Sequence, residues 1–199
     1  QIDEKDQLGH TCLFHAVEKA VASNLPERWY NFITFLLKKK ANPDERDDFS
    51  ETPLLYSLSY LLSSCKFGAH RQPDALYPAY GNNSGIQAVK TWSLLLEDKA
   101  RPNAKDENDR SLLHVLLSLL KTGHLTSSQV REIVCKGIPI LEKYEMKINS
   151  IDSEGNTALH MWASLMLPSI SDEMIKIGSE IVSHGGNVNS RNKDRKSVV

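Results

Sequence analysis

Cysteine is scarce in this sequence, and neither sign of charge is in excess. The three cysteines among 199 residues, Cys12, Cys65 and Cys135, lie far apart, which argues against a disulfide framework and fits a reducing compartment. The formal net charge of −1 gives no overall field that would attract nucleic acid or a membrane surface. No run approaches the roughly 18 apolar residues of a membrane span, and no signal peptide is recognisable. We therefore expect an intracellular protein, cytoplasmic or nuclear, that does not enter a membrane.

Catalytic motifs are missing as well. There is no Gly-x-Ser-x-Gly elbow, no glycine-rich phosphate loop, no His-Glu-x-x-His helix and no Cys-x-x-Cys pair. His10, Cys12 and His15 lie within six residues, but no fourth ligand for a structural zinc site is evident. The sequence thus predicts no enzyme, no cofactor, no bound metal and no small-molecule substrate. The alternative is an enzyme fragment with a latent metal site at these three residues, which would require stoichiometric zinc in the purified protein.

A nine-residue stretch recurs along the chain. Its clearest copy is D-S-E-G-N-T-A-L-H from Asp152 to His160, in which an acidic residue is followed by a glycine and then by Thr-x-Leu-His. The glycine allows a tight turn, and the hydroxyl of Thr157 is placed to cap a helix that follows at once. Related nonamers begin at Asp6, Asp47, Asp106 and Asn192.

A second landmark stands three residues before each nonamer. It is an aspartate or an asparagine in every case: Asp3, Asp44, Asn103, Asn149 and Asn189. A turn, a pair of helices and a tail of this kind resemble the ankyrin repeat. The resemblance covers the whole chain and implies an all-α ankyrin-repeat solenoid, in which helix-turn-helix units stack and the turns project as fingers.

The resemblance divides the chain into one array of unequal units. The Thr or Ser positions of successive nonamers are 41, 59, 46 and 40 residues apart, against about 33 in the family, so the units are expanded. Neither end resembles a polar cap, so we expect a piece of a longer polypeptide. The expected divisions are 1–5 (tail of a preceding repeat), 6–46 (repeat 1), 47–105 (repeat 2, with an inserted loop at 63–85), 106–151 (repeat 3), 152–191 (repeat 4) and 192–199 (start of a truncated repeat 5).

Apolar residues at helical spacing predict two helices after each nonamer. The helix that starts at Pro26 has an apolar stripe, including Trp29 and Phe32, that is expected to be buried. In the third unit Pro139 is expected to break or kink a helix. The inserted loop at 63–85 contains two tyrosines that either bind a partner or pack on the array.

Ankyrin arrays bind through an extended concave face formed by the fingers and the first helices. Phe49 is the best anchor candidate, because aromatic residues dominate binding hot spots, although it could instead pack on the next finger. The family's variable positions give these candidate partner-binding residues: Lys5, Gln7, Leu8, His10, Arg46, Asp48, Phe49, Glu51, Tyr60, Lys105, Glu107, Asn108, Arg110, Ile151, Ser153, Glu154 and Asn156.

The resemblance implies a non-catalytic module that binds another protein or another segment of its parent chain. The alternative is a nucleic-acid-binding module that uses basic patches, in which case binding should weaken steeply with salt. The lysines 38–40 also have a simpler explanation, since cations at a helix C-terminus offset the helix dipole. The residues of these patches are Lys38, Lys39, Lys40, Arg191, Lys193, Arg195 and Lys196.

Overall fold

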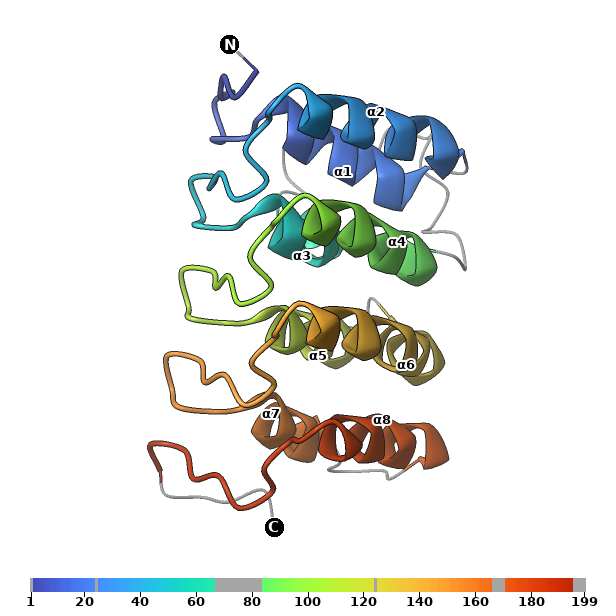
Figure 1. The fold of residues 1–199 in the computed structure, drawn as a ribbon. Helices are drawn as coiled ribbons and strands as arrows, with labels where there is room; N and C mark the ends of the chain where they lie inside the picture. Colours follow the sequence, from blue (N-terminus) through green and yellow to red (C-terminus); the bar gives the residue numbers. More distant parts are fainter. Residues whose placement is uncertain (1, 24, 67–83, 124, 166–170, 195–199) are drawn as a thin grey trace.

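The computed structural model describes residues 2–23, 25–66, 84–123, 125–165 and 171–194. These residues form helix pairs that stack in one direction, and a long turn projects on one side of the stack between successive pairs (Figure 1). The helices are α1 (Cys12–Ala22), α2 (Pro26–Lys38), α3 (Pro53–Lys66), α4 (Ser84–Glu97), α5 (Leu112–Lys121), α6 (Ser127–Lys143), α7 (Ala158–Leu165) and α8 (Asp172–Ser183).

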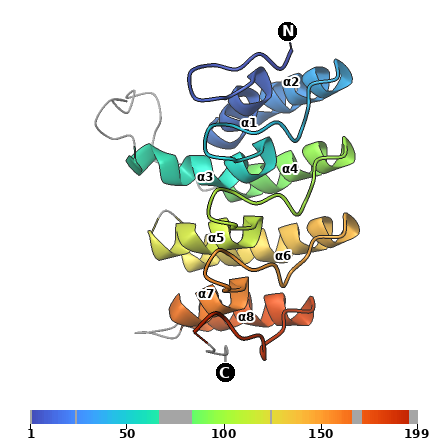
Figure 2. The same ribbon diagram turned by 90° about the vertical axis from the view of Figure 1, so that its left-hand side faces the viewer.

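The helices lie in two rows. Seen from the side of the turns, α1, α3, α5 and α7 form one row and α2, α4, α6 and α8 the other (Figure 2). Apolar side chains between the rows and between neighbouring pairs form one continuous core, so each unit is buried mainly by its neighbours. Fully buried members include Leu13, Ile33, Leu58, Trp92, Leu116, Ile133, Leu159 and Ile177.

The predicted helices are present, with two differences. The expected loop at 63–85 is shorter, because α3 continues to Lys66 and α4 begins at Ser84; residues 67–83, with Tyr77 and Tyr80, lie outside the described residues. Pro139 was expected to break or kink a helix; it does not break it, since α6 continues through Pro139. A proline inside a helix costs about 3 kcal/mol, but one face of α6 is fully buried between α4 and α8, which holds the helix together.

In each unit, the second residue beyond the end of the second helix has a left-handed backbone conformation. This residue is Lys40, Lys99, Glu145 and Gly185 in the four units, with φ between 63° and 93°. A left-handed backbone costs a residue with a Cβ atom about 1 kcal/mol, which glycine avoids. Three of the four units therefore contain local strain at this helix end.

Lys99 allows this strain to be measured. We expect Lys99→Gly to be more stable than Lys99→Ala by about 1 kcal/mol, because both variants lose the charge but only glycine loses the Cβ atom. Urea denaturation of the two variants, compared with wild type, provides the measurement. Equal stabilities of the glycine and alanine variants would contradict the left-handed assignment.

Candidate interaction surface: the fingers

The aspartate that opens each nonamer folds the tip of a finger. Its Oδ1 atom accepts hydrogen bonds at 2.8–2.9 Å from the backbone N–H groups two and four residues later. These bonds satisfy N–H groups that have no helical or strand partner. The same arrangement occurs in the fingers opened by Asp6, Asp47, Asp106 and Asp152.

The second landmark residue joins one unit to the next. Its Oδ1 atom accepts the backbone N–H of a residue in the tail of the following unit, at 2.6–3.0 Å. We call this series the tail ladder. Its rungs are Asp3 with Asn42, Asp44 with Arg101, Asn103 with Lys147, and Asn149 with Asn187. The sequence marked these positions but not their inter-unit role.

A second series, the basic ladder, runs along the fingers. Lys5 donates to the carbonyl oxygen of Arg46 at 2.7 Å, Arg46 to that of Lys105 at 2.8 Å, and Lys105 to that of Ile151 at 2.6 Å. The Lys5 ammonium also lies 2.8 Å from Glu45 and holds the pKa of that carboxyl below its usual value. These three basic residues, predicted to contact a partner, thus hold the fingers to one another.

The histidine of the Thr/Ser-x-Leu-His motif makes its hydrogen bonds inside the array. The side chain of His114 is buried; its Nδ1 accepts the N–H of Ser111 and lies 2.7 Å from the Ser111 hydroxyl, and its Nε2 lies 2.9 Å from the carbonyl oxygen of Asn156. A carbonyl only accepts, so Nε2 carries the hydrogen of a neutral ring. Burial lowers the pKa of His114, which agrees with that neutral form.

The same pairing changes the expected cap of Thr157. The hydroxyl of Thr157 lies 2.9 Å from Nδ1 of His160, and the N–H of Thr157 donates to the same nitrogen. The histidine of the first helical turn therefore reaches back to the residue that precedes the helix. This resembles a capping box, in which a side chain from the first turn satisfies the backbone N–H before it.

Some candidate partner-binding residues are not accessible. His10 and Glu51 are 6% and 8% exposed, so the expectation that they contact a partner does not agree with their burial. Arg110 is held by Asp106, whose Oδ2 lies 2.7 Å from both Nε and Nη2. Tyr60 is half-buried and packs against the core.

The other finger candidates reach the surface to different extents. Phe49 and Ile151 are 40% and 50% exposed. Leu8 and Asn156 are half-buried, and Asn156 lies near the carboxylates of Asp152 and Glu154. The remaining tip residues are exposed: Gln7, Asp48, Glu107, Asn108, Ser153 and Glu154. They come from successive fingers and lie along one side of the stack (Figure 1).

Burial changes the chemistry of Glu51. It raises the pKa of Glu51 to about 7, and the nearby Asp47 and Asp106 also raise it. The hydroxyl of Ser59 donates to Glu51 Oε2 at 2.6 Å and opposes the shift. A carboxyl group that titrates close to neutral pH thus lies beneath the second finger.

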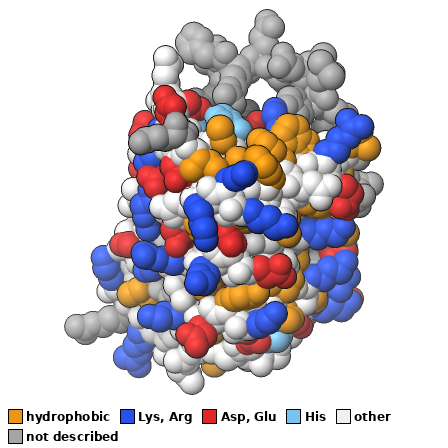
Figure 3. Space-filling view, turned by 45° about the horizontal axis from the view of Figure 1, so that its top comes forward, with side chains coloured by type: hydrophobic (Ala, Val, Ile, Leu, Met, Phe, Trp, Pro, Cys, Tyr) orange, Lys and Arg blue, Asp and Glu red, His pale blue; other side chains and the backbone are white. Residues whose placement is uncertain are grey.

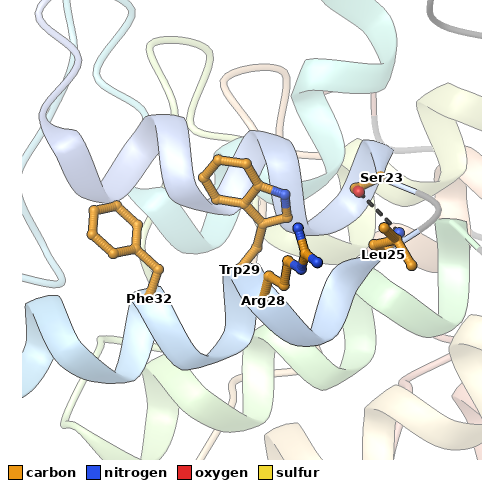
Figure 4. A pocket seen from close by; sticks show the side chains of 5 residues that line it. All are labelled: Ser23, Leu25, Arg28, Trp29 and Phe32. Atoms are coloured by element: carbon orange, nitrogen blue, oxygen red, sulfur yellow. Dashed lines mark hydrogen bonds between the residues drawn. The ribbon is translucent and has the colours of Figure 1, made fainter.

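A different surface lies on α2. Leu25, Phe32 and Phe35 are 62%, 40% and 51% exposed, and apolar side chains gather there among lysines and arginines at the end of the stack seen in Figure 3. Trp29, Phe32, Leu25, Ser23 and Arg28 line a shallow pocket (Figure 4). Phe32, a member of the expected apolar stripe of α2, is thus part of an exposed apolar surface in the described chain.

The basic patches do not form one strip. Lys38 is the last residue of α2, with Lys39 and Lys40 directly after it, at one end of the array, whereas Arg191 and Lys193 lie in the last described turn at the other end (Figure 1). The Lys39 ammonium lies 5.8 Å from the ring centroid of Phe35, and Lys193 donates to the carbonyl of Ser153. Arg195 and Lys196 lie outside the described residues.

His10 and His15 lie close to an aspartate rather than to the cysteine with which the sequence grouped them. Cys12 is exposed at the start of α1, and Asp6 rather than Cys12 lies with His10 and His15. Burial raises the pKa of Asp6, but the N–H groups of Leu8 and His10 and the ring of His15 lower it, so that it lies below its usual value.

Stacked helix pairs with hydrogen-bonded fingers define an α-helical repeat solenoid. Comparison with solved structures shows which kind: the fold is similar to that of an ankyrin repeat domain from Acinetobacter baumannii, with a TM-score of 0.59 and 16% identity, over 99% of this chain and 76% of that one. The chain therefore has the ankyrin-repeat fold, as predicted. No protein-family model and no curated protein matches the sequence. No helix within the described ranges is long and apolar enough to cross a membrane.

The tail ladder predicts the cost of losing a rung. Asn103 accepts from the N–H of Lys147 at 2.6 Å and donates to the carbonyl of Glu145 at 3.0 Å. We expect Asn103→Ala to lower the free energy of unfolding by about 1–2 kcal/mol and to speed hydrogen exchange at the Lys147 amide. Asn31→Ala, at an exposed position of α2, is the control. A loss no larger than that of the control would show that the rung contributes nothing.

Glu51 predicts a pH dependence. Its folded pKa of about 7 lies above the usual value of 4.5, so its contribution to stability is complete below pH 4.5 and is lost as pH rises through 7. The Glu51→Gln variant has no carboxyl group at this position to ionise, so it does not lose this stability as pH rises. The stability of the variant relative to wild type should therefore increase from pH 4.5 to pH 8 by about 3 kcal/mol. Denaturation series at several pH values test this, with the exposed Glu107→Gln as control; parallel curves for Glu51→Gln and wild type would refute it.

Proposed function

We propose that this chain is a non-catalytic protein-interaction module that binds an extended polypeptide segment along its fingers. The supporting observation is that some finger residues stabilise the array while others face solvent. The opening aspartates fold each tip and the two ladders connect the units, while the residues just after each aspartate face solvent. Side chains presented in this way by a rigid scaffold are typical of binding loops.

The charges of the fingers favour one kind of partner. Lys5, Arg46 and Lys105 are engaged with carbonyl oxygens. In contrast, Asp48 and Glu107 are exposed and make no ion pair within the described part of the chain. Because no ion pair neutralises these two carboxylates, they favour a partner segment with lysine or arginine side chains.

Apolar groups complete this surface. Phe49 follows Asp48 on the second finger, and Ile151 precedes the fourth finger tip. A large side chain that stays 40% exposed beside a carboxylate suits an anchor for an apolar residue of the partner. The partner segment therefore combines basic and apolar residues, and it comes from another protein or from elsewhere in a longer chain of which this is a part.

The nucleic-acid alternative has less support. A phosphate backbone needs a run of available cations, whereas the basic patches lie at opposite ends of the stack and the finger tips between them carry carboxylates.

Selection of peptides from a random display library tests the proposal. Peptides enriched on the wild-type protein should contain lysine or arginine next to a large apolar residue, and their affinity should fall with salt. Phe49→Ala should weaken the best peptide about 30-fold, the equivalent of about 2 kcal/mol for a hot spot. Asp48→Asn should weaken it further.

The control is Ile175→Ala, which removes an apolar side chain that is 47% exposed on α8, away from the fingers. Peptide affinity should be unchanged in this variant. Circular dichroism establishes that all variants are folded. If the affinity of the selected peptides is unchanged by Phe49→Ala but lowered by Ile175→Ala, the binding surface does not lie on the fingers, and the proposal fails.

A further inference from the structure

Around the first finger, two histidines and an aspartate lie close together, although the repeat itself does not require histidines at these positions. We propose that Asp6, His10 and His15 bind a divalent transition-metal ion, for which zinc is the best match. One potential ligand atom from each residue lies within 4.8 Å of the other two, and within the described ranges no other three His, Cys, Asp or Glu side chains are so arranged. Two imidazoles with one carboxylate suit zinc, whereas calcium and magnesium prefer oxygen ligands throughout.

Two of the three ligand atoms already lie at a spacing close to that of neighbouring metal ligands. Asp6 Oδ2 and His15 Nε2 are 3.0 Å apart. Neighbouring ligand atoms of a tetrahedral ion with bonds of ~2.0 Å are ~3.3 Å apart. The carboxylate of Asp6 is already oriented, because its other oxygen accepts two backbone N–H groups of the finger. Asp6 and His15 are 39% and 45% exposed, which leaves a further coordination position open to water.

A buried carboxylate lies behind His10. Nε2 of His10 is 3.3 Å from Oδ2 of Asp47, and the two side chains are 6% and 0% exposed. Despite this distance, neither atom makes a hydrogen bond of good geometry within the described part of the chain. Buried polar atoms in this state are costly. An ion bound at Nδ1 fixes the ring hydrogen on Nε2, facing Asp47, which is the usual carboxylate support of a metal-binding histidine.

A carboxylate also lies near the other ring nitrogen of His15, beyond hydrogen-bond distance. Its Nδ1 lies 3.9 Å from Oε2 of Glu18, a side chain that is 7% exposed. Its Nε2 faces Asp6 and is therefore the nitrogen directed at the ion. The ring of His10 is fixed by stacking on Phe14 at 5.0 Å and by Tyr56 at 4.7 Å, measured between ring centroids. The His10 imidazole is thus oriented before any ion arrives, which lowers the cost of binding it.

The other fingers show how the same aspartate is used without these histidines. At the position of His10, the third finger has Arg110, which binds Oδ2 of Asp106, and the fourth has Asn156, 3.4 Å from Oδ2 of Asp152. At the position of His15 these units have Val115 and Met161, which offer no comparable ligand. The two histidines are therefore particular to the first finger and are no requirement of the repeat.

Isothermal titration of zinc into chelator-treated protein tests this proposal. We expect one Zn²⁺ per chain, no comparable binding of Ca²⁺ or Mg²⁺, and a Co²⁺ spectrum of low coordination number. His15→Gln and Asp6→Asn each remove a ligand and should weaken zinc binding by at least about tenfold. Asp6→Asn keeps an oxygen for the N–H groups of Leu8 and His10, so the finger should still fold.

Two variants serve as matched controls. Cys12→Ser removes the nearest thiol, and His184→Gln removes a histidine that lies 2.9 Å from Glu142 and 3.3 Å from Glu180 in the last unit. Neither should change the zinc affinity. The proposal is overturned if wild type binds no zinc at about millimolar concentration, if both ligand variants bind zinc as wild type does, or if Cys12→Ser abolishes binding.

Discussion

The array depends on hydrogen bonds from backbone N–H groups to Asp and Asn side chains. Helices satisfy their own backbone, but a finger has few internal partners, and buried or crowded N–H groups without acceptors are costly. One carboxylate in each of the first four nonamers accepts two such groups, and the Asp or Asn of each of the first four tails accepts a group of the next unit. The helices stack by apolar contact, whereas the tail bonds connect each unit to the next on the side of the fingers.

The sequence predicted the features that repeat. The Asp and Thr-x-Leu-His positions, with the Asp or Asn of each tail, indicated the ankyrin fold although the units are unequal in length, because these positions serve the backbone wherever a finger forms. Local rules were less reliable where packing opposed them. Pro139 lies within α6 because neighbouring helices bury that helix on one face.

Residues that act on a different unit were harder to predict. Lys5 donates to a carbonyl 41 residues later and Arg46 to one 59 residues later, so nothing in the local pattern distinguishes them from side chains free to contact a partner. The same holds for His10, whose buried partner Asp47 belongs to the next finger. The grouping of Asp6 with His15 required the turn geometry, because sequence proximity had favoured Cys12.

The two ladders also affect how the molecule deforms. Each rung is a hydrogen bond made by a side chain of limited reach, so the two ladders limit how far neighbouring fingers can separate. A segment lying across several fingers would therefore meet contact points whose separation the protein itself restricts.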